Sequence, residues 1–164
     1  MNGLAFISDC KTWRYWLTRR WDDSLGELVF CMLNPSIADA VTDDPTVTRC
    51  IERAKRLGYG KLIVVNLFAM ISTDPRHLQH ASDPVGPLND VVLDVVAKTP
   101  SSIKVVCAWG VHGNICDGRA HQVLTRFKAA NKPLHVLKLS KSGMPCHPLY
   151  LPYDLAPIPW NPEV

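Results

Sequence analysis

The stretch LVFCMLNPS at residues 28–36 joins six apolar residues directly to Asn34, Pro35 and Ser36. An apolar run without alternation is typical of a strand covered on both faces, as in the middle of a parallel sheet. Asparagine, proline and serine favour turns, so the strand is expected to end near Leu33. The stretch therefore predicts a central strand that delivers polar residues to one edge of a sheet.

The segment before this stretch reads as a second strand. Between residues 13 and 21, aromatic and apolar residues share one face at a period of two, and basic residues and threonines share the other. The turn-like sequence DDSLG at residues 22–26 separates this segment from the run at 28–33. We therefore predict an N-terminal β-hairpin that pairs residues 13–21 with residues 28–33.

Strands and helices alternate through the rest of the chain. A helix is expected to start at Asp44-Pro45 and to end at Gly58. Further strands are predicted at 62–68, 103–110 and 134–139, further helices at 87–98 and 116–129, and a proline-rich surface tail from Pro145. This order predicts an α/β fold, a three-layer sandwich with a mainly parallel central sheet, in one domain over residues 1–164.

Composition narrows the function classes. The 164 residues are 47% hydrophobic and 20% charged, which fits one globular domain, and the net charge of +3 leaves room only for a local basic patch. No apolar run of 18 residues and no signal peptide are visible, so no membrane association is expected. The six cysteines include no Cys-x-x-Cys pair, so we predict no metal and no cofactor, reduced thiols, and a cytoplasmic location.

Ligands of parallel α/β sheets bind outside the carboxyl ends of the strands. That rule selects Asn34-Pro35-Ser36, Asn66-Leu67-Phe68 and Trp109-Gly110, which follow three of the predicted strands. A fourth segment, residues 147–150, follows the last strand after a loop and begins with His147. We therefore expect these four segments to form the functional site.

The four segments resemble, in order and approximate spacing, the motifs of the uracil-DNA glycosylase superfamily over about residues 28–150. The resemblance implies a uracil-DNA glycosylase-like fold. The chain more closely resembles a family of short bacterial and phage proteins of unknown function, through LNPS at 33–36, DPT at 44–46, NLFA at 66–69 and HPLYL at 147–151. It departs from the most active uracil-removing glycosylases at Asn34, where they have aspartate, and at Leu149, where a serine is usual.

The resemblance implies different catalytic and binding roles for these residues. Asn34 and His147 would be catalytic, the first orienting a water and the second, if neutral, donating to a carbonyl of the departing base. Asn66 offers the donors and acceptor that match uracil or thymine, and Phe68 a stacking surface. The predicted substrate-binding residues are Leu33, Pro35, Ser36, Asn66, Phe68, Trp109, Gly110 and Tyr150, and the predicted nucleic-acid-binding residues are Arg14, Arg20, Arg49 and Lys141.

Structural roles compete with each of these assignments. The Asn34-Pro35-Ser36 segment also fits a plain turn, Phe68 and Trp109 also fit core packing, and most of the basic residues also fit a solvated face. The main functional hypothesis is a DNA glycosylase-like hydrolase that acts on an altered or mismatched base. The alternatives are a recognition module for nucleic acid or nucleotides without catalysis, and a hydrolase of free nucleosides or nucleotides.

Overall fold

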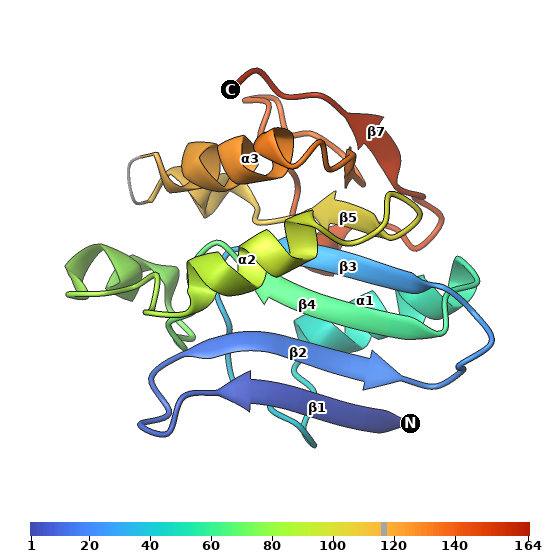
Figure 1. The fold of residues 1–164 in the computed structure, drawn as a ribbon, viewed down its shortest axis with the longest axis horizontal. Coiled ribbons are helices and arrows are strands. Elements are labelled where there is room, and N and C mark those ends of the chain that lie inside the picture. The colour runs from blue at the N-terminus through green and yellow to red at the C-terminus, as the bar shows by residue number, and fades with distance from the viewer. Residues whose placement is uncertain (116–117) are drawn as a thin grey trace.

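The computed structural model describes residues 1–115 and 118–164. Within them the sheet has the strand order β1-β2-β4-β3-β5-β6-β7 (Figure 1). The strands are β1 (Asn2–Ile7), β2 (Arg14–Arg20), β3 (Glu27–Met32), β4 (Lys61–Asn66), β5 (Lys104–Cys107), β6 (Leu134–Val136) and β7 (Ile158–Trp160). The helices are α1 (Pro45–Arg56), α2 (Asn89–Ala97) and α3 (Arg119–Ala129), with short 3-10 helices η1 (Pro75–His80), η2 (Val111–Asn114) and η3 (Pro148–Tyr150).

The fold is α/β, but the sheet is mixed rather than mainly parallel. The four inner strands β4, β3, β5 and β6 are parallel to one another, whereas β1, β2 and β7 join antiparallel at the two edges. The prediction missed the edge strands β1 and β7. The tail strand β7 contains Pro159, and a proline is tolerated at a sheet edge because its missing N–H is not needed there.

The predicted hairpin between residues 13–21 and 28–33 is wrong. Both segments are strands, but β4 lies between them, and the N-terminal hairpin is formed by β1 and β2 instead. The peptide N–H groups of Trp21 and Asp22 donate to the carbonyl of Gly60, and Gly60 donates to Gly26. The connection at 21–26 therefore wraps around the start of β4 instead of closing a tight turn.

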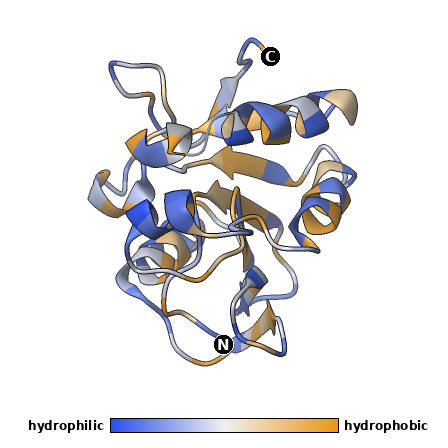
Figure 2. Ribbon diagram, turned by 90° about the vertical axis from the view of Figure 1, so that its left-hand side faces the viewer, coloured by the Kyte–Doolittle hydropathy of each residue, from blue (hydrophilic) through white to orange (hydrophobic). Residues whose placement is uncertain are grey.

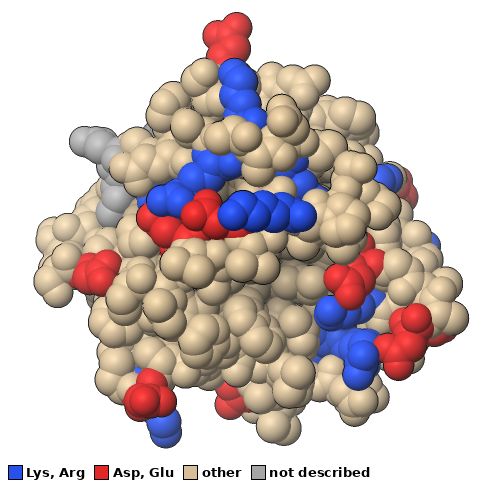
Figure 3. Space-filling view, in the orientation of Figure 1, with Lys and Arg blue, Asp and Glu red and all other residues tan. Residues whose placement is uncertain are grey.

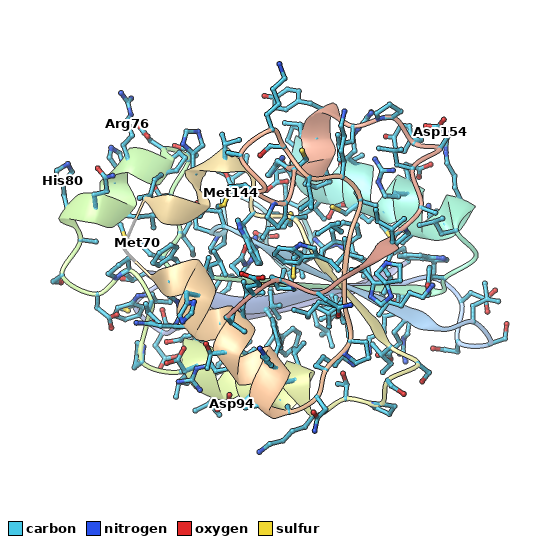
Figure 4. The ribbon with its side chains drawn as sticks, turned by 90° about the horizontal axis from the view of Figure 1, so that it is seen from above. Met70, Arg76, His80, Asp94, Met144 and Asp154 are labelled. Atoms are coloured by element: carbon cyan, nitrogen blue, oxygen red, sulfur yellow. The ribbon has the colours of Figure 1, made fainter. Side chains whose placement is uncertain are left out.

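Helices cover both faces of the sheet. Leu28 and Phe30 of β3 pack on the α1 side, while Val29 and Cys31 pack on the side of α2 and α3. Figure 4, seen from above the view in Figure 1, shows α1 on one side of the sheet and the other two helices on the opposite side. Because both faces are buried, β3 is apolar from Leu28 to Met32, as the sequence predicted.

Helix α1 forms where the sequence predicted it. The Asp44 carboxylate accepts a hydrogen bond of 2.8 Å from the N–H of Val47, and Pro45 occupies the first helical position. Gly58, just beyond the helix, has a φ of +80°. The other predicted helices appear as α2 and α3, and the first two positions of the range 116–129 lie outside the described residues.

The parallel strands all end on one side of the molecule, which faces the viewer in Figure 2. The strands there are apolar, and the outer parts of the surrounding helices are more hydrophilic. Among the described residues, no helix has the length and apolar character needed to cross a bilayer.

Candidate functional site

A cavity of about 570 Å³ opens where the parallel strands end. Its walls come from the residues after β3 and β5, the first turn of α1, the loop before η1 and the segment around η3. Pockets that bind small ligands commonly measure about 300–1,000 Å³. Seven of the predicted catalytic and substrate-binding residues line this cavity, namely Leu33, Asn34, Ser36, Trp109, Gly110, His147 and Tyr150.

The side chain of Asn34 has a fixed orientation. Its Nδ2 donates to the carbonyls of Pro35 and Ser72, each across 2.9 Å, with a longer contact of 3.4 Å to the carbonyl of Met70. Because carbonyl oxygens only accept hydrogen bonds, the amide atom that faces these three carbonyls is the nitrogen and not the oxygen. The Oδ1 atom accepts no hydrogen bond from any described residue, so Asn34 lines the cavity with a free acceptor.

His147 is held as a neutral imidazole with a defined tautomer. The N–H of Leu149 donates to Nδ1 across 3.3 Å, so Nδ1 is an acceptor and the ring proton sits on Nε2. Burial lowers the pKa of His147 below its ordinary value, and the charge of Asp44 only partly opposes this shift. The ring therefore offers an N–H donor from Nε2, which hydrogen-bonds to no described residue.

The residues after β5 form the wall next to His147. Gly110 has a φ of +77°, and a Cβ built on it would lie 3.2 Å from Cβ of His147. Trp109 is 2% exposed and packs edge-on against Trp160, with ring centroids 6.0 Å apart. Trp109 therefore belongs mainly to the core, and Gly110 provides the space in which His147 lies.

Two predicted base-binding residues do not reach the cavity. Asn66 is fully buried, and its side-chain nitrogen and oxygen have no hydrogen-bond partner in the described part of the chain. It pairs with Met32 across the strands, and Met32 itself lines the cavity. Phe68 is 1% exposed and lies in the core beneath α2 and α3. Pro35 is also buried and contributes its carbonyl to Asn34 and Ser72 rather than a cavity wall.

The cavity contains two charged residues to which the sequence analysis gave other roles. Asp44, expected only to cap a helix, is 6% exposed and is the only acidic residue among the described residues that line the cavity. Arg14, expected to contact nucleic acid, is 1% exposed and also lines it. Asp44 ends the loop of residues 33–44 that joins β3 to α1, and its place as the cap of α1 was the signal available in the sequence.

The other three predicted nucleic-acid-binding residues are scattered. Arg20 lies at the far end of β2 from Arg14 and forms an exposed ion pair of 3.0 Å with Asp23. Arg49 donates to the carbonyl of Leu151, and its guanidinium lies 4.0 Å from the ring centre of Tyr153, while Lys141 is exposed in the loop before η3. On the face drawn in Figure 3, basic and acidic side chains lie next to each other. These residues do not form a basic surface around the cavity.

Buried hydrogen bonds from α1 hold the segment that follows η3. Arg53 is fully buried and donates to the carbonyls of Leu151, Pro152 and Leu155. Figure 4 shows η3 beside α1. The segment that supplies His147 is therefore fixed against the same helix whose first turn lines the cavity.

The described residues contain no group of three or more His, Cys, Asp or Glu side chains that would hold a metal ion. The cysteines within strands, Cys31 and Cys107, are fully buried, and burial raises the pKa of Cys31 to about 12. The described residues that line the cavity supply amide, imidazole, carboxylate and guanidinium groups, together with the thiol of Cys146 and hydroxyl groups such as those of Ser36, Ser72 and Tyr150.

Comparison with known proteins gives one match. The model of a family described as "Protein of unknown function (DUF1643)" matches residues 14–149. This span contains the first three strand-end segments and residues 147–149 of the fourth, and it confirms the predicted likeness to a family of unknown function. No curated protein and no solved structure matches the chain.

Proposed function

The chain belongs to this family of proteins of unknown function, and from its own residues we propose that it binds a nucleobase-containing ligand in the cavity and hydrolyses the N-glycosidic bond. The observation that carries the proposal is that Asn34 and His147 line the same cavity, although they are 113 positions apart in the sequence. Asn34 offers a free hydrogen-bond acceptor and His147 a neutral donor. The likeness to the uracil-DNA glycosylase superfamily is part of the proposal and rests on the order of the motifs.

Cleavage of this bond needs a positioned water and stabilisation of the departing base. Oδ1 of Asn34 orients the water by accepting a hydrogen bond, and Asp44 is the cavity group able to take the proton that the water loses. The Nε2–H of His147 donates to the base carbonyl on which negative charge develops, an interaction worth about 3 kcal/mol in the transition state. The bond from C1′ to the base breaks as the bond from water oxygen to C1′ forms.

The placement of charge favours a free nucleoside or nucleotide over DNA. A DNA-binding surface needs several basic side chains that track the phosphates beside the site. Of the four predicted contacts, only Arg14 lies at the cavity, where it is buried. Because DNA was the main hypothesis from the sequence, the two substrates need a direct comparison.

Recognition without catalysis is the second candidate. Asn34 favours it, because a carboxamide orients water but does not accept a proton as a carboxylate does. Under this alternative, the same ligands bind and the glycosidic bond stays intact.

The test measures base release by chromatography and ligand binding by calorimetry. The substrates are pyrimidine nucleosides, their monophosphates, and oligonucleotides that contain uracil or a mismatch. Asn34→Ala and His147→Ala should abolish base release, whereas His121→Ala, at an exposed position of α3, should leave it unchanged. If both cavity variants fold and still bind and cleave as the parent protein does, the proposal fails.

A further inference from the structure

Arg14 is a buried cation with few partners. Its side chain is 1% exposed, and it donates from Nη1 to the carbonyl of Ala38 across 2.6 Å. Its Nε has no hydrogen-bond partner among the described residues, and no described ion pair involves this guanidinium. Burial lowers the pKa of Arg14 to about 10, although the charges of Asp44 and Asp39 oppose the shift. A buried charge normally has a partner, because desolvation without one is costly.

An irregularity in the sheet aims Arg14 at the cavity. The register between β1 and β2 shifts between Phe6 and Ile7, so that Phe6 pairs with Trp16 while Ile7 pairs with Arg14. Strict alternation would place Arg14 on the same face as Trp16, which packs on the side of α2 and α3. The shift turns Arg14 toward Ala38 on the other side, where it lines the cavity.

The amino end of α1 adds donors to the same cavity. Asp44, Thr46 and Val47 all line it, and α1 is 12 residues long. The N–H of Val47 is taken by Asp44, but the N–H of Thr46 donates to no described residue. The first N–H groups of a helix carry partial positive charge and favour an anion. The first turn of α1 and the guanidinium of Arg14 thus both present unpaired hydrogen-bond donors to the cavity.

Asp44 opposes an anion there but does not neutralise Arg14. The two side chains are near enough for their charges to interact, yet no ion pair joins them within 4.0 Å among the described contacts. One oxygen of Asp44 is engaged with the peptide N–H of Val47. An anion bound at Arg14 is therefore attracted by the guanidinium and repelled by the Asp44 carboxylate. Removing the charge of Asp44 measures this repulsion as a change in affinity.

The geometry points to a phosphate-binding subsite in the cavity, formed by the Arg14 guanidinium and the first turn of α1. If the proposed function holds, the substrate is a nucleotide, with its phosphate at Arg14 and its base at His147. Guanidinium groups suit this task because their fork of donors matches the oxygens of a phosphate.

The experiment measures binding of inorganic phosphate and ribose 5-phosphate to the full chain by calorimetry, with ribose and acetate as comparison ligands. We expect both phosphates to bind, ribose not to bind, and acetate to bind more weakly. Arg14→Met should weaken phosphate binding about tenfold to a hundredfold, because charge-assisted hydrogen bonds are lost. Arg20→Met, at the other end of the same strand, is the matched control and should bind as the parent protein does.

Two further variants keep the inference testable if Arg14→Met does not fold. Arg14→Lys retains the charge but loses the fork, and should weaken binding about tenfold. Asp44→Asn retains a helix cap, removes the opposing charge, and should strengthen phosphate binding. The inference is overturned if the folded parent protein does not bind phosphate, or if folded Arg14 variants bind it unchanged.

The outcomes of the binding and cleavage experiments distinguish failure of the phosphate subsite from failure of the proposed hydrolase activity. Cleavage of uridine and uridine monophosphate at equal rates, with no phosphate binding, would remove the subsite and leave the hydrolase proposal in place. Phosphate binding that depends on Arg14, with no base release from any substrate, would support the subsite and remove the hydrolase proposal.

Discussion

The peptide N–H of Leu149 donates to Nδ1 of His147 across 3.3 Å, so the fold itself selects the tautomer of the cavity histidine. The same ring is partly buried, and this desolvation lowers its pKa from the ordinary value of 6.5. A neutral ring with its proton on Nε2 is the form required to donate to a leaving base. This relationship has consequences for the pH dependence of both activity and stability.

The activity of the protein should be flat above the lowered pKa of His147 and fall below it. Protonation adds a charge and breaks the hydrogen bond that Nδ1 accepts, so we expect base release to drop about tenfold per pH unit on the acid side. The profile of kcat against pH measures this. An acid limb centred at or above pH 6.5 would contradict a buried neutral histidine.

Stability should also rise with pH through the same window. Between the lowered pKa of folded His147 and 6.5, the unfolded chain binds more protons, so the free energy of unfolding increases as pH rises. His147→Gln should remove this part of the dependence. His135, whose pKa is also lowered by burial, should contribute a separate part, whereas His121→Gln at an exposed position should change nothing. Urea unfolding of the parent protein and of the two variants at several pH values tests this.

Asn34→Asp should destabilise the protein rather than create a better catalyst. The resemblance to uracil-removing glycosylases suggests that aspartate would supply a general base at this position. In this protein Nδ2 faces the carbonyls of Pro35 and Ser72 at 2.9 Å, and a carboxylate oxygen would meet them without a donor. We expect a loss of about 2–4 kcal/mol in the free energy of unfolding, from the lost hydrogen bonds and the unpaired charge.

Asn34→Ala is the comparison for that loss. It removes the same hydrogen bonds but places no oxygen against the carbonyls, so it should destabilise less than Asn34→Asp at pH 7. Urea titrations of the two variants give the difference. Equal stability of Asn34→Asp and the parent protein would show that the loop from Asn34 to Ser72 rearranges.

Gly110→Ala should disturb His147, and Gly58→Ala is the comparison at a glycine of similar φ. Gly110 combines a φ of +77° with a ψ of −174°, a region adopted almost only by glycine, so alanine there carries a backbone cost in addition to any contact, whereas Gly58 has a φ of +80°. Only at Gly110 does the added Cβ approach another residue, at 3.2 Å from Cβ of His147. We therefore expect a larger loss of stability at Gly110, together with a shifted imidazole resonance of His147 in the NMR spectrum. Equal effects of the two substitutions would mean that the site accommodates the methyl group.

The strand ends were predictable from sequence because their causes are local. The apolar run of β3 and the turn residues that follow it place Asn34 at the sheet edge, and Asp44 with Pro45 fixes the start of α1. The parallel strands then bring Asn34 and Trp109 to the same end of the sheet. These features depend on a few neighbouring residues and on the rule that ligands bind outside the carboxyl ends of parallel strands.

The features that sequence analysis missed depend on contacts between distant segments. The direction of Arg14 follows from a register shift against β1, a strand that the hydrophobic pattern did not reveal. The position of β4 between β2 and β3 follows from hydrogen bonds of the connection at 21–26 to Gly60. The face on which Asn66 lies is set by β4, whose alternation places it with Leu62 and Val64 under α1 rather than in the cavity.

Asn66→Leu should stabilise the protein, because both polar atoms of this fully buried side chain lack partners among the described residues. A buried amide without hydrogen bonds costs about 1–3 kcal/mol, and leucine has the same branching and the same number of side-chain heavy atoms, with no polar atoms. We expect an increase of about 1 kcal/mol or more in the free energy of unfolding, seen as a higher urea midpoint with an unchanged slope.

Asn89→Leu is the matched control for this substitution. Asn89 is also fully buried, but its Nδ2 donates to the carbonyls of Asn66 and Leu67, so leucine there should destabilise by about 1–3 kcal/mol. If Asn66→Leu loses as much stability as Asn89→Leu, a buried water satisfies the Asn66 amide. A stable Asn66→Leu variant that binds nucleotides more weakly would have a different meaning. It would show that Asn66 contacts the base in a conformation in which Met32 has moved aside, as its role predicted from the sequence requires.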